Sequence, residues 1–277
     1  MGTNKRNRLL LPGLLALALL AACGKSGETR HASGHEGHDG GHTTGTSGLE
    51  ASFSFAAGHA AANEKSELVI RITDRQGNPV ERYEENHEKL LHLIVVDHRL
   101  AYFNHLHPEY RGNGEFAVAT TFPEGGSYKV FADFVPEGGS NETIGEWLTV
   151  EGKEAAHTEL KADKRLVRAV DGIEVELALG EPKAGEDTKL VFTIRDDKTK
   201  EGIDDLEPYL GAAGHVVILS ADAERYLHVH PTDEKGTGPT AEFSTSFPRG
   251  GVYKIWGQFQ HEGRVITAGF VVTVGEI

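Results

Sequence analysis

The feature that most constrains this chain of 277 residues is an internal repeat that contains histidines. Residues 92–108 read HLIVVDHRLAYFNHLHP, and residues 215–231 read HVVILSADAERYLHVHP. A second match, FPEGGSYKVFADF at 122–134 with FPRGGVYKIWGQF at 247–259, lies downstream. The ungapped alignment of the first match pairs His92 with His215, His105 with His228, His107 with His230 and Pro108 with Pro231. The sequence therefore predicts two copies of one domain, each with the same three histidines.

Both copies have the pattern of short β-strands. Runs rich in β-branched and aromatic residues alternate with turn sequences such as GNP, GNG and PEGG, and no helical period is present. We expect strands at 66–74, 92–96, 101–107, 115–122, 127–134 and 144–150, and in the second copy at 173–179, 188–196, 215–219, 225–230, 241–247, 252–259 and 265–274. The expected fold is all-β, with two tandem β-sandwich domains of immunoglobulin or cupredoxin type.

The N-terminal segment has the composition of an export signal. Three basic residues between positions 5 and 8 precede an apolar run at 9–20, which is too short to span a bilayer well. The run ends in LAACG at 20–24, which resembles a bacterial lipobox. That resemblance implies cleavage before Cys23 and lipidation of its thiol, so that the protein is anchored to the cell membrane on its extracytoplasmic face. The alternative is an ordinary secretory signal in which Cys23 is incidental.

Residues 24–48 consist largely of Gly, Ser, Thr and His, and this composition predicts disorder. The segment supplies weaker candidate metal ligands or, alternatively, only a hydrophilic spacer; the histidines in question are His31, His35, His38 and His42. The complete expected organisation is a signal peptide at 1–22, a lipidated His-rich segment at 23–50, a sandwich at 51–152, a linker at 153–170 and a second sandwich at 171–277.

Charge and sulfur content narrow the function. The formal net charge of −14 becomes −17 when the three basic residues of the signal are removed, which argues against nucleic acid or an anionic membrane surface as a partner. Cys23 is the only cysteine and Met1 the only methionine. A blue-copper centre needs a thiolate, so that class is excluded for the repeats. Imidazole ligation alone suits Cu(II) or Zn(II), and it is compatible with Cu(I).

The spacing of the repeated histidines predicts that they meet on a β-hairpin. If the two strands pair around a turn near residues 98–99, His92 lies opposite His105, with Cβ atoms about 4.5–5.5 Å apart. His107 is two residues beyond His105 and shares its face. The same pairing applies to the second copy. We therefore predict two copper or zinc sites, formed by His92, His105 and His107 and by His215, His228 and His230; the alternative is that these are structural histidines.

Several other residues are weaker candidates. Asp133 and Gln258 occupy matching positions in the strand of the second repeat match, where Asp133 would be the better ligand, and His261 follows closely. Four histidines have no counterpart in the other copy, and we expect them at the surface: His59, His87, His98 and His157. Because only neutral imidazole binds metal, binding is expected to weaken as pH falls through about 6.5.

The strings PYLGAAGH at 208–215 and YLHVHP at 226–231 resemble a signature of YtkA-like or cupredoxin-like β-sandwich modules in bacterial secreted proteins. Those modules are associated with heavy-metal handling. The resemblance covers both repeats and implies the sandwich fold and a metal as ligand. The first copy departs from the signature, since it has ENHE at 85–88 where the second copy has the PYLG context.

The leading interpretation is a lipid-anchored extracytoplasmic protein that binds copper or zinc for buffering, delivery or sensing, with a metal transporter or sensor as its partner. One alternative is an adhesive or structural pair of sandwiches in which the histidines only pack. Another is a metalloenzyme in which three histidines leave an open metal position for water or dioxygen. No repeated carboxylate offers a general base beside the histidines, so we expect binding and not catalysis.

Overall fold

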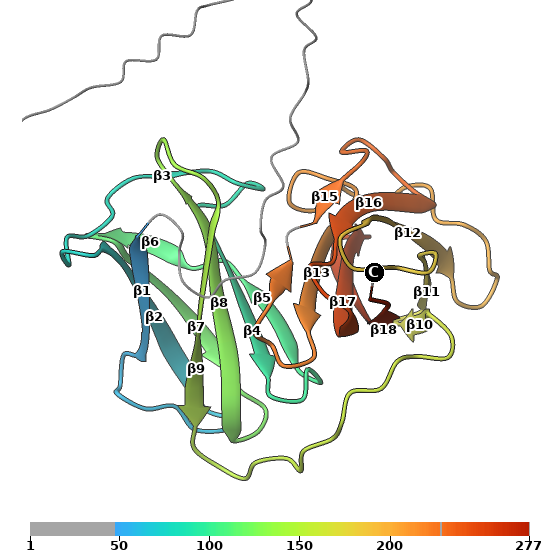
Figure 1. Ribbon diagram of the computed structural model, residues 1–277. Coiled ribbons are helices and arrows are strands. Elements are labelled where there is room, and N and C mark those ends of the chain that lie inside the picture. Colours follow the sequence, from blue (N-terminus) through green and yellow to red (C-terminus); the bar gives the residue numbers. More distant parts are fainter. Residues whose placement is uncertain (1–47, 228, 277) are drawn as a thin grey trace, which may run out of the picture. The chain divides into compact units, whose positions relative to one another are not determined.

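The computed structural model describes residues 48–227 and 229–276, which belong to one compact unit made of strands and turns. Figure 1 shows the strands of these residues, most of them labelled, with colours that follow the chain order. Within the described ranges, no helix has the length and apolar character needed to cross a membrane. The all-β prediction, with two repeated sandwich domains, is confirmed.

The first sandwich contains two antiparallel sheets. One has the strand order β1-β2-β7-β6, and the other has the order β3-β8-β4-β5, with β9 also paired with β8. The strands are β1 (Leu49–Phe55), β2 (Lys65–Asp74), β3 (Tyr83–Glu84), β4 (Leu91–Asp97), β5 (Phe103–Leu106), β6 (Glu109–Gly112), β7 (Glu115–Thr121), β8 (Gly126–Pro136) and β9 (Glu142–Val150).

The second sandwich repeats this plan. Its sheets have the orders β10-β11-β12-β16-β15 and β14-β13-β17-β18. The strands are β10 (Val167–Val170), β11 (Ile173–Ala178), β12 (Asp187–Asp196), β13 (His215–Ser220), β14 (Tyr226–Leu227), β15 (His230–Pro231), β16 (Thr240–Ser246), β17 (Gly251–His261) and β18 (Arg264–Val274). Strand β10 lies inside the segment predicted as a linker, because its four residues pair with β11.

Each sandwich has its own apolar core. Leu68, Phe116 and Val130 are among the fully buried residues of the first core, and Phe192, Ile255 and Phe270 are among those of the second. Alternate residues of each strand point into the core, as expected for sheets that cover each other on one face.

A third apolar cluster joins the two sandwiches. In β4, Leu93 and Val95 belong to the core of the first sandwich, whereas Ile94 and Val96 pack in this third cluster. In β13, the third cluster contains Val217 and Leu219. Both faces of β4 are therefore buried, which explains why consecutive residues of this strand are apolar. The strand is central to the fold because it serves two cores.

The β4–β5 hairpin differs in register from the prediction. Ile94, and not His92, is the Cα partner of His105, so the pairing is shifted by two residues. The cause is the turn. Asp97 Oδ1 accepts hydrogen bonds from the backbone N–H groups of Ala101 and Tyr102, at 2.7 and 2.9 Å, so the turn between the two strands is longer than expected. A shift of two residues keeps every side chain on its original face.

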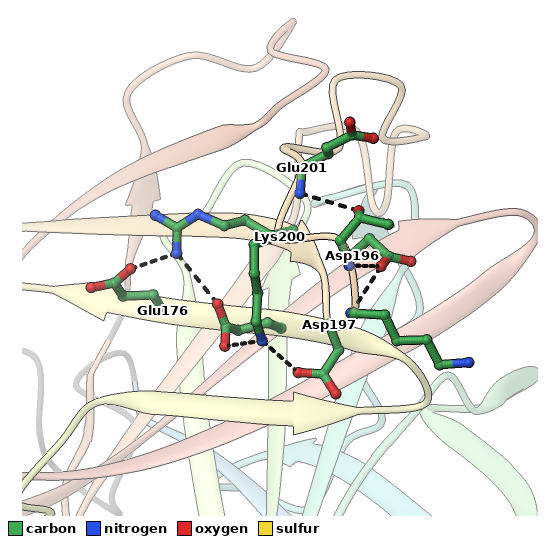
Figure 2. A network of polar contacts seen from close by, with 9 residues as sticks. Glu176, Asp196, Asp197, Lys200 and Glu201 are labelled. Atoms are coloured by element: carbon green, nitrogen blue, oxygen red, sulfur yellow. Dashed lines mark hydrogen bonds and ion pairs between the residues drawn. The ribbon is translucent and has the colours of Figure 1, made fainter.

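An exposed polar network stabilises the end of β12, far in sequence from the repeated histidines. Arg195 donates to Glu176 at 2.6 Å, and Lys200 lies 2.9 Å from Glu174 and 3.0 Å from Asp197 (Figure 2). Surface ion pairs of this kind contribute about 0–1 kcal/mol each. We assign this network to the structure of the turn after β12, because Arg195 and Lys200 pair with carboxylates of β11 and of that turn.

Candidate metal centre

Three histidines of the first repeat come together as the sequence predicts. His92 lies on β4, His105 on β5, and His107 directly after β5. Each offers one ring nitrogen, and the three nitrogens all lie within 4.8 Å of one another. The ring centroids of His92 lie 5.2 Å from His105 and 5.1 Å from His107, and those of His105 and His107 are 4.8 Å apart. We call these three residues the histidine triad.

The outer nitrogens of two triad residues face oxygen acceptors. His92 Nε2 lies 2.9 Å from the backbone carbonyl oxygen of Asn86, which can only accept, so this nitrogen carries the hydrogen. His105 Nδ1 lies 2.7 Å from Oε1 of Gln258, so it also donates. In neutral rings with these tautomers, His92 Nδ1 and His105 Nε2 both carry lone pairs, and these atoms are 3.0 Å apart. Two lone pairs at this distance repel each other unless a proton or a metal ion lies between them.

His107 supplies the third nitrogen. Its Nε2 is buried and has no hydrogen-bond partner among the described residues. Burial, with a smaller contribution from His92, lowers the pKa of His107 to about 4. Burial followed by the same neighbour lowers the pKa of His105 to about 3. Both rings are therefore neutral near pH 7 and can donate lone pairs to a metal.

The carbonyl of Asn86 is held in place by a tight turn. His87 and Glu88 have φ values of 47° and 64°, and Asn86 and Lys89 exchange backbone hydrogen bonds of 2.9 and 3.1 Å across them. Two successive residues other than glycine rarely both adopt this left-handed conformation. The second repeat contains the same turn at residues 209–212, where Leu210 and Gly211 have φ values of 55° and 80°.

Asp133 supports this turn. Its Oδ1 accepts hydrogen bonds from Asn141 Nδ2 at 2.6 Å and from Thr143 at 3.0 Å. Asn141 Oδ1 in turn accepts a hydrogen bond from Asn86 Nδ2 at 3.1 Å. Asp133, which the sequence suggests as a weaker ligand, is the Cα partner of His92 in β8. Its hydrogen bonds anchor the loop whose Asn86 carbonyl orients the His92 ring.

Two further histidines lie beside the triad. The ring of His215 is 4.9 Å from that of His105 and 5.7 Å from that of His92. The ring of His87 is 5.6 Å from His215 and 6.2 Å from His92. The sequence predicts a separate site for His215 and a surface position for His87, whereas in the structure His87 is half-buried beside His92 and His215. In the alignment of the two repeats His87 pairs with Leu210, so the repeated histidines alone do not identify it.

Of the remaining candidates, only His230 and His261 belong to the described residues. His230 is exposed on β15, and His261 lies 3.1 Å from Asp205, outside the group of potential ligands found among the described residues. His228, Cys23 and the histidines of the N-terminal segment (His31, His35, His38 and His42) fall outside the described residues. His98 and His157 stack at 5.8 Å, away from the triad.

Fold and site together define a tandem of two β-sandwiches with a cluster of histidines where the sandwiches meet. The family model DUF8832, a domain of unknown function, matches twice, at residues 45–152 and 168–276. The chain therefore belongs to this family. Among curated proteins, none matches the chain.

Solved structures with a similar arrangement are distant. The Escherichia coli adhesin FdeC has 17% identity and a TM-score of 0.27, with 82% of this chain and 65% of that chain covered. Invasin, a bacterial integrin-binding protein, has 13% identity and a TM-score of 0.24, with 80% and 39% covered. This chain thus spans less than two thirds of either. The titin Ig tandem A164–A165 has 10% identity and a TM-score of 0.21, with 83% and 99% covered.

Proposed function

We propose that this protein binds a copper or zinc ion through His92, His105 and His107. The observation that carries the proposal is the orientation of the rings. The outer nitrogens of His92 and His105 face oxygen acceptors while their inner nitrogens converge, 3.0 Å apart. Histidines that bind metals almost always donate their other N–H group to a carbonyl or carboxylate oxygen in this way.

The donor set supports the same ions. Imidazole nitrogens bind Zn(II) and Cu(II) well, and the chain has no cysteine or methionine after residue 23. The low pKa values of His105 and His107, about 3 and about 4, keep both rings ready to bind at neutral pH. With a lipid on Cys23, as the sequence predicts, the ion would be buffered or delivered at the extracytoplasmic face of the cell membrane.

The test is metal binding by the tag-free chain with the four histidines of the N-terminal segment replaced by serine. Titration calorimetry with Zn(II) is expected to find one site with a dissociation constant of micromolar or lower. The double variant His105→Ala with His107→Ala is expected to abolish that site. The matched control is His98→Ala with His157→Ala, which removes a pair of neighbouring histidines outside the triad and is expected to leave binding unchanged.

A structural role for the histidines is the competing explanation, because a proton on either inner nitrogen would make the His92–His105 contact an ordinary hydrogen bond. A chain that is folded by circular dichroism but binds no metal tighter than millimolar would establish that role and overturn the proposal.

A further inference from the structure

Histidines of both sandwiches lie close together, and we propose that both sandwiches supply ligands to the bound ion. In this arrangement His215 is the fourth ligand and Gln258 orients His105, so that metal binding and the docking of the sandwiches stabilise each other. This inference rests on the proposed function and adds to it the composition of the site and its consequence.

The ring positions fit four ligands around one ion. Zinc–nitrogen bonds of about 2.0–2.1 Å in a tetrahedron place the ring centroids about 5 Å apart. The centroid distances within the triad are 4.8, 5.1 and 5.2 Å. His215 adds distances of 4.9 Å to His105 and 5.7 Å to His92. The His215 ring therefore lies beside the triad at close to the spacing of a fourth imidazole, and a turn of this side chain would bring its nitrogen to the ion that the triad holds.

The orientation of His105 also depends on the second sandwich. Gln258 belongs to β17, and its buried Oε1 lies 2.7 Å from His105 Nδ1. Its Nε2 donates to Thr267 on the neighbouring strand at 3.1 Å, which fixes the amide. Gln258 is also the Cα partner of His215. One strand pair of the second sandwich thus supplies both the candidate fourth ligand and the group that orients a ligand of the first sandwich.

The surrounding contacts hold the two faces together next to the ion. Phe103 stacks on Trp256 at 4.7 Å, and Phe131 packs on Tyr226 at 5.6 Å. Lys129, which is buried, reaches Glu224 at 3.3 Å. The ion can contact both sandwiches only when they are docked. Docking therefore raises the affinity for the ion, and the bound ion raises the docking equilibrium constant by the same factor.

The number of imidazole ligands tests the composition. X-ray absorption of the zinc-loaded chain, with the N-terminal histidines replaced, is expected to give four imidazoles, and His215→Ala or His215→Gln is expected to give three with affinity about 100-fold weaker. The matched control His230→Ala removes the exposed histidine of the same repeat and is expected to change neither. Three imidazoles in the parent chain, with unchanged affinity in both His215 variants, would overturn the inference and leave the proposed function standing.

Two variants of Gln258 test whether this residue orients His105 or only packs against it. Gln258→Leu keeps the volume but removes the acceptor, and the loss of an outer hydrogen bond typically weakens metal binding by about 10–100-fold. Gln258→Glu retains an acceptor oxygen and is expected to restore affinity. Equal weakening in both variants would mean that Gln258 only packs, which would overturn its assigned role.

Hydrogen exchange tests the coupling in the unmodified interface. Zinc is expected to slow amide exchange at least tenfold in β13 as well as in β4 and β5, since both sandwiches are held by the ion. Protection confined to β4 and β5 would show that the ion binds the first sandwich alone. Absence of zinc binding altogether would be seen first by calorimetry and would overturn the proposed function instead.

Discussion

His92 and His215 occupy the same position in the two repeats, and their imidazole rings lie 5.7 Å apart with an angle of 14° between their planes. Residues related by the repeat thus face each other across the boundary between the sandwiches. A two-fold homodimer has this property, because the same surface is used on both subunits. Here the two surfaces belong to one chain, which allows them to differ.

The difference is visible at the position next to each histidine. Asp133 accepts a hydrogen bond from Thr143, whereas Gln258, at the matching position, donates one to Thr267. The carboxylate therefore holds a loop of its own sandwich, while the amide has an oxygen left for His105. Duplication followed by this exchange explains how a symmetric interface could come to hold a single, asymmetric group of histidines.

Replacement of Asp97 is expected to disturb both the hairpin and the metal centre. Asp97 is buried, and its Oδ1 accepts two backbone hydrogen bonds in the turn before the strand of His105. Asp97→Ala would leave these N–H groups without an acceptor, at a cost of about 2–3 kcal/mol. Urea denaturation would measure the loss of stability, and a zinc titration the accompanying loss of affinity.

The second repeat offers a matched control for this change. Ser220 occupies the position equivalent to Asp97, and its Oγ accepts the N–H of Arg225 at 2.9 Å. Asp97→Ser is therefore expected to recover about half of the lost stability. Equal stability of the Ala and Ser variants would show that the hydroxyl cannot replace the carboxylate in this turn.

Much of the fold was predictable because the sandwich signal is local. Alternation of apolar residues placed most strands within two residues of their observed ends, as for 115–122 and β7. The strands that the sequence did not predict are all edge strands, namely the seven-residue β1 and the shorter β3, β6 and β10. The predicted strand at 225–230 is interrupted and contributes to two different sheets as β14 and β15.

The candidate site was predictable only within one repeat. Strand periodicity put His92, His105 and His107 on one face, and this grouping survives the two-residue register shift. The approach of His215 and Gln258 depends on how one sandwich packs on the other. No periodicity within a hairpin contains that information, and the apolar residues on both faces of β4 left open which face belongs to the core.

The apolar cluster between the sandwiches is expected to contribute substantially to stability. Trp256 is 4% exposed and stacks on Phe103. Trp256→Ala would leave a cavity and is expected to cost about 3–5 kcal/mol in chemical denaturation. The other tryptophan, Trp147, is 38% exposed, so Trp147→Ala is expected to cost about 1 kcal/mol or less. Similar losses in the two variants would contradict a packed interface.

The β17–β18 hairpin offers a stabilising substitution. Glu262 and Gly263 form its two-residue turn with φ values of 51° and 69°, a geometry that favours Asn-Gly. Asn113 and Gly114 already use that pair, with φ values of 53° and 69°. Glu262→Asn is expected to raise the free energy of unfolding by about 0.5–1 kcal/mol, seen as a higher midpoint in thermal melts. The reverse change, Asn113→Glu, is expected to lower it.

Stability without metal is expected to fall in mild acid. The pKa values of His105 and His107 in the folded state, about 3 and about 4, lie below the ordinary value of 6.5. The unfolded chain therefore binds more protons below pH 6.5, and the stability difference grows down to the folded-state values. At pH 5 this costs about 1–2 kcal/mol per histidine. Denaturation of the His105→Ala, His107→Ala variant should show a shallower pH dependence; parallel curves would contradict the shifted pKa values.

Metal affinity is expected to resist acid better than the sequence alone suggests. Three ordinary imidazoles with pKa values of about 6.5 would lose about 1000-fold in affinity between pH 7.5 and 5.5, through proton competition. Because burial lowers the pKa values of His105 and His107 to about 3 and about 4, protons do not compete at these two rings in that range. We expect a loss well below 1000-fold, measured with a competing zinc indicator. A peptide of residues 24–48 is the control, since its imidazoles are expected to follow the steep dependence. A 1000-fold loss in the folded protein would mean that its ligands are solvent-exposed histidines and not the buried triad.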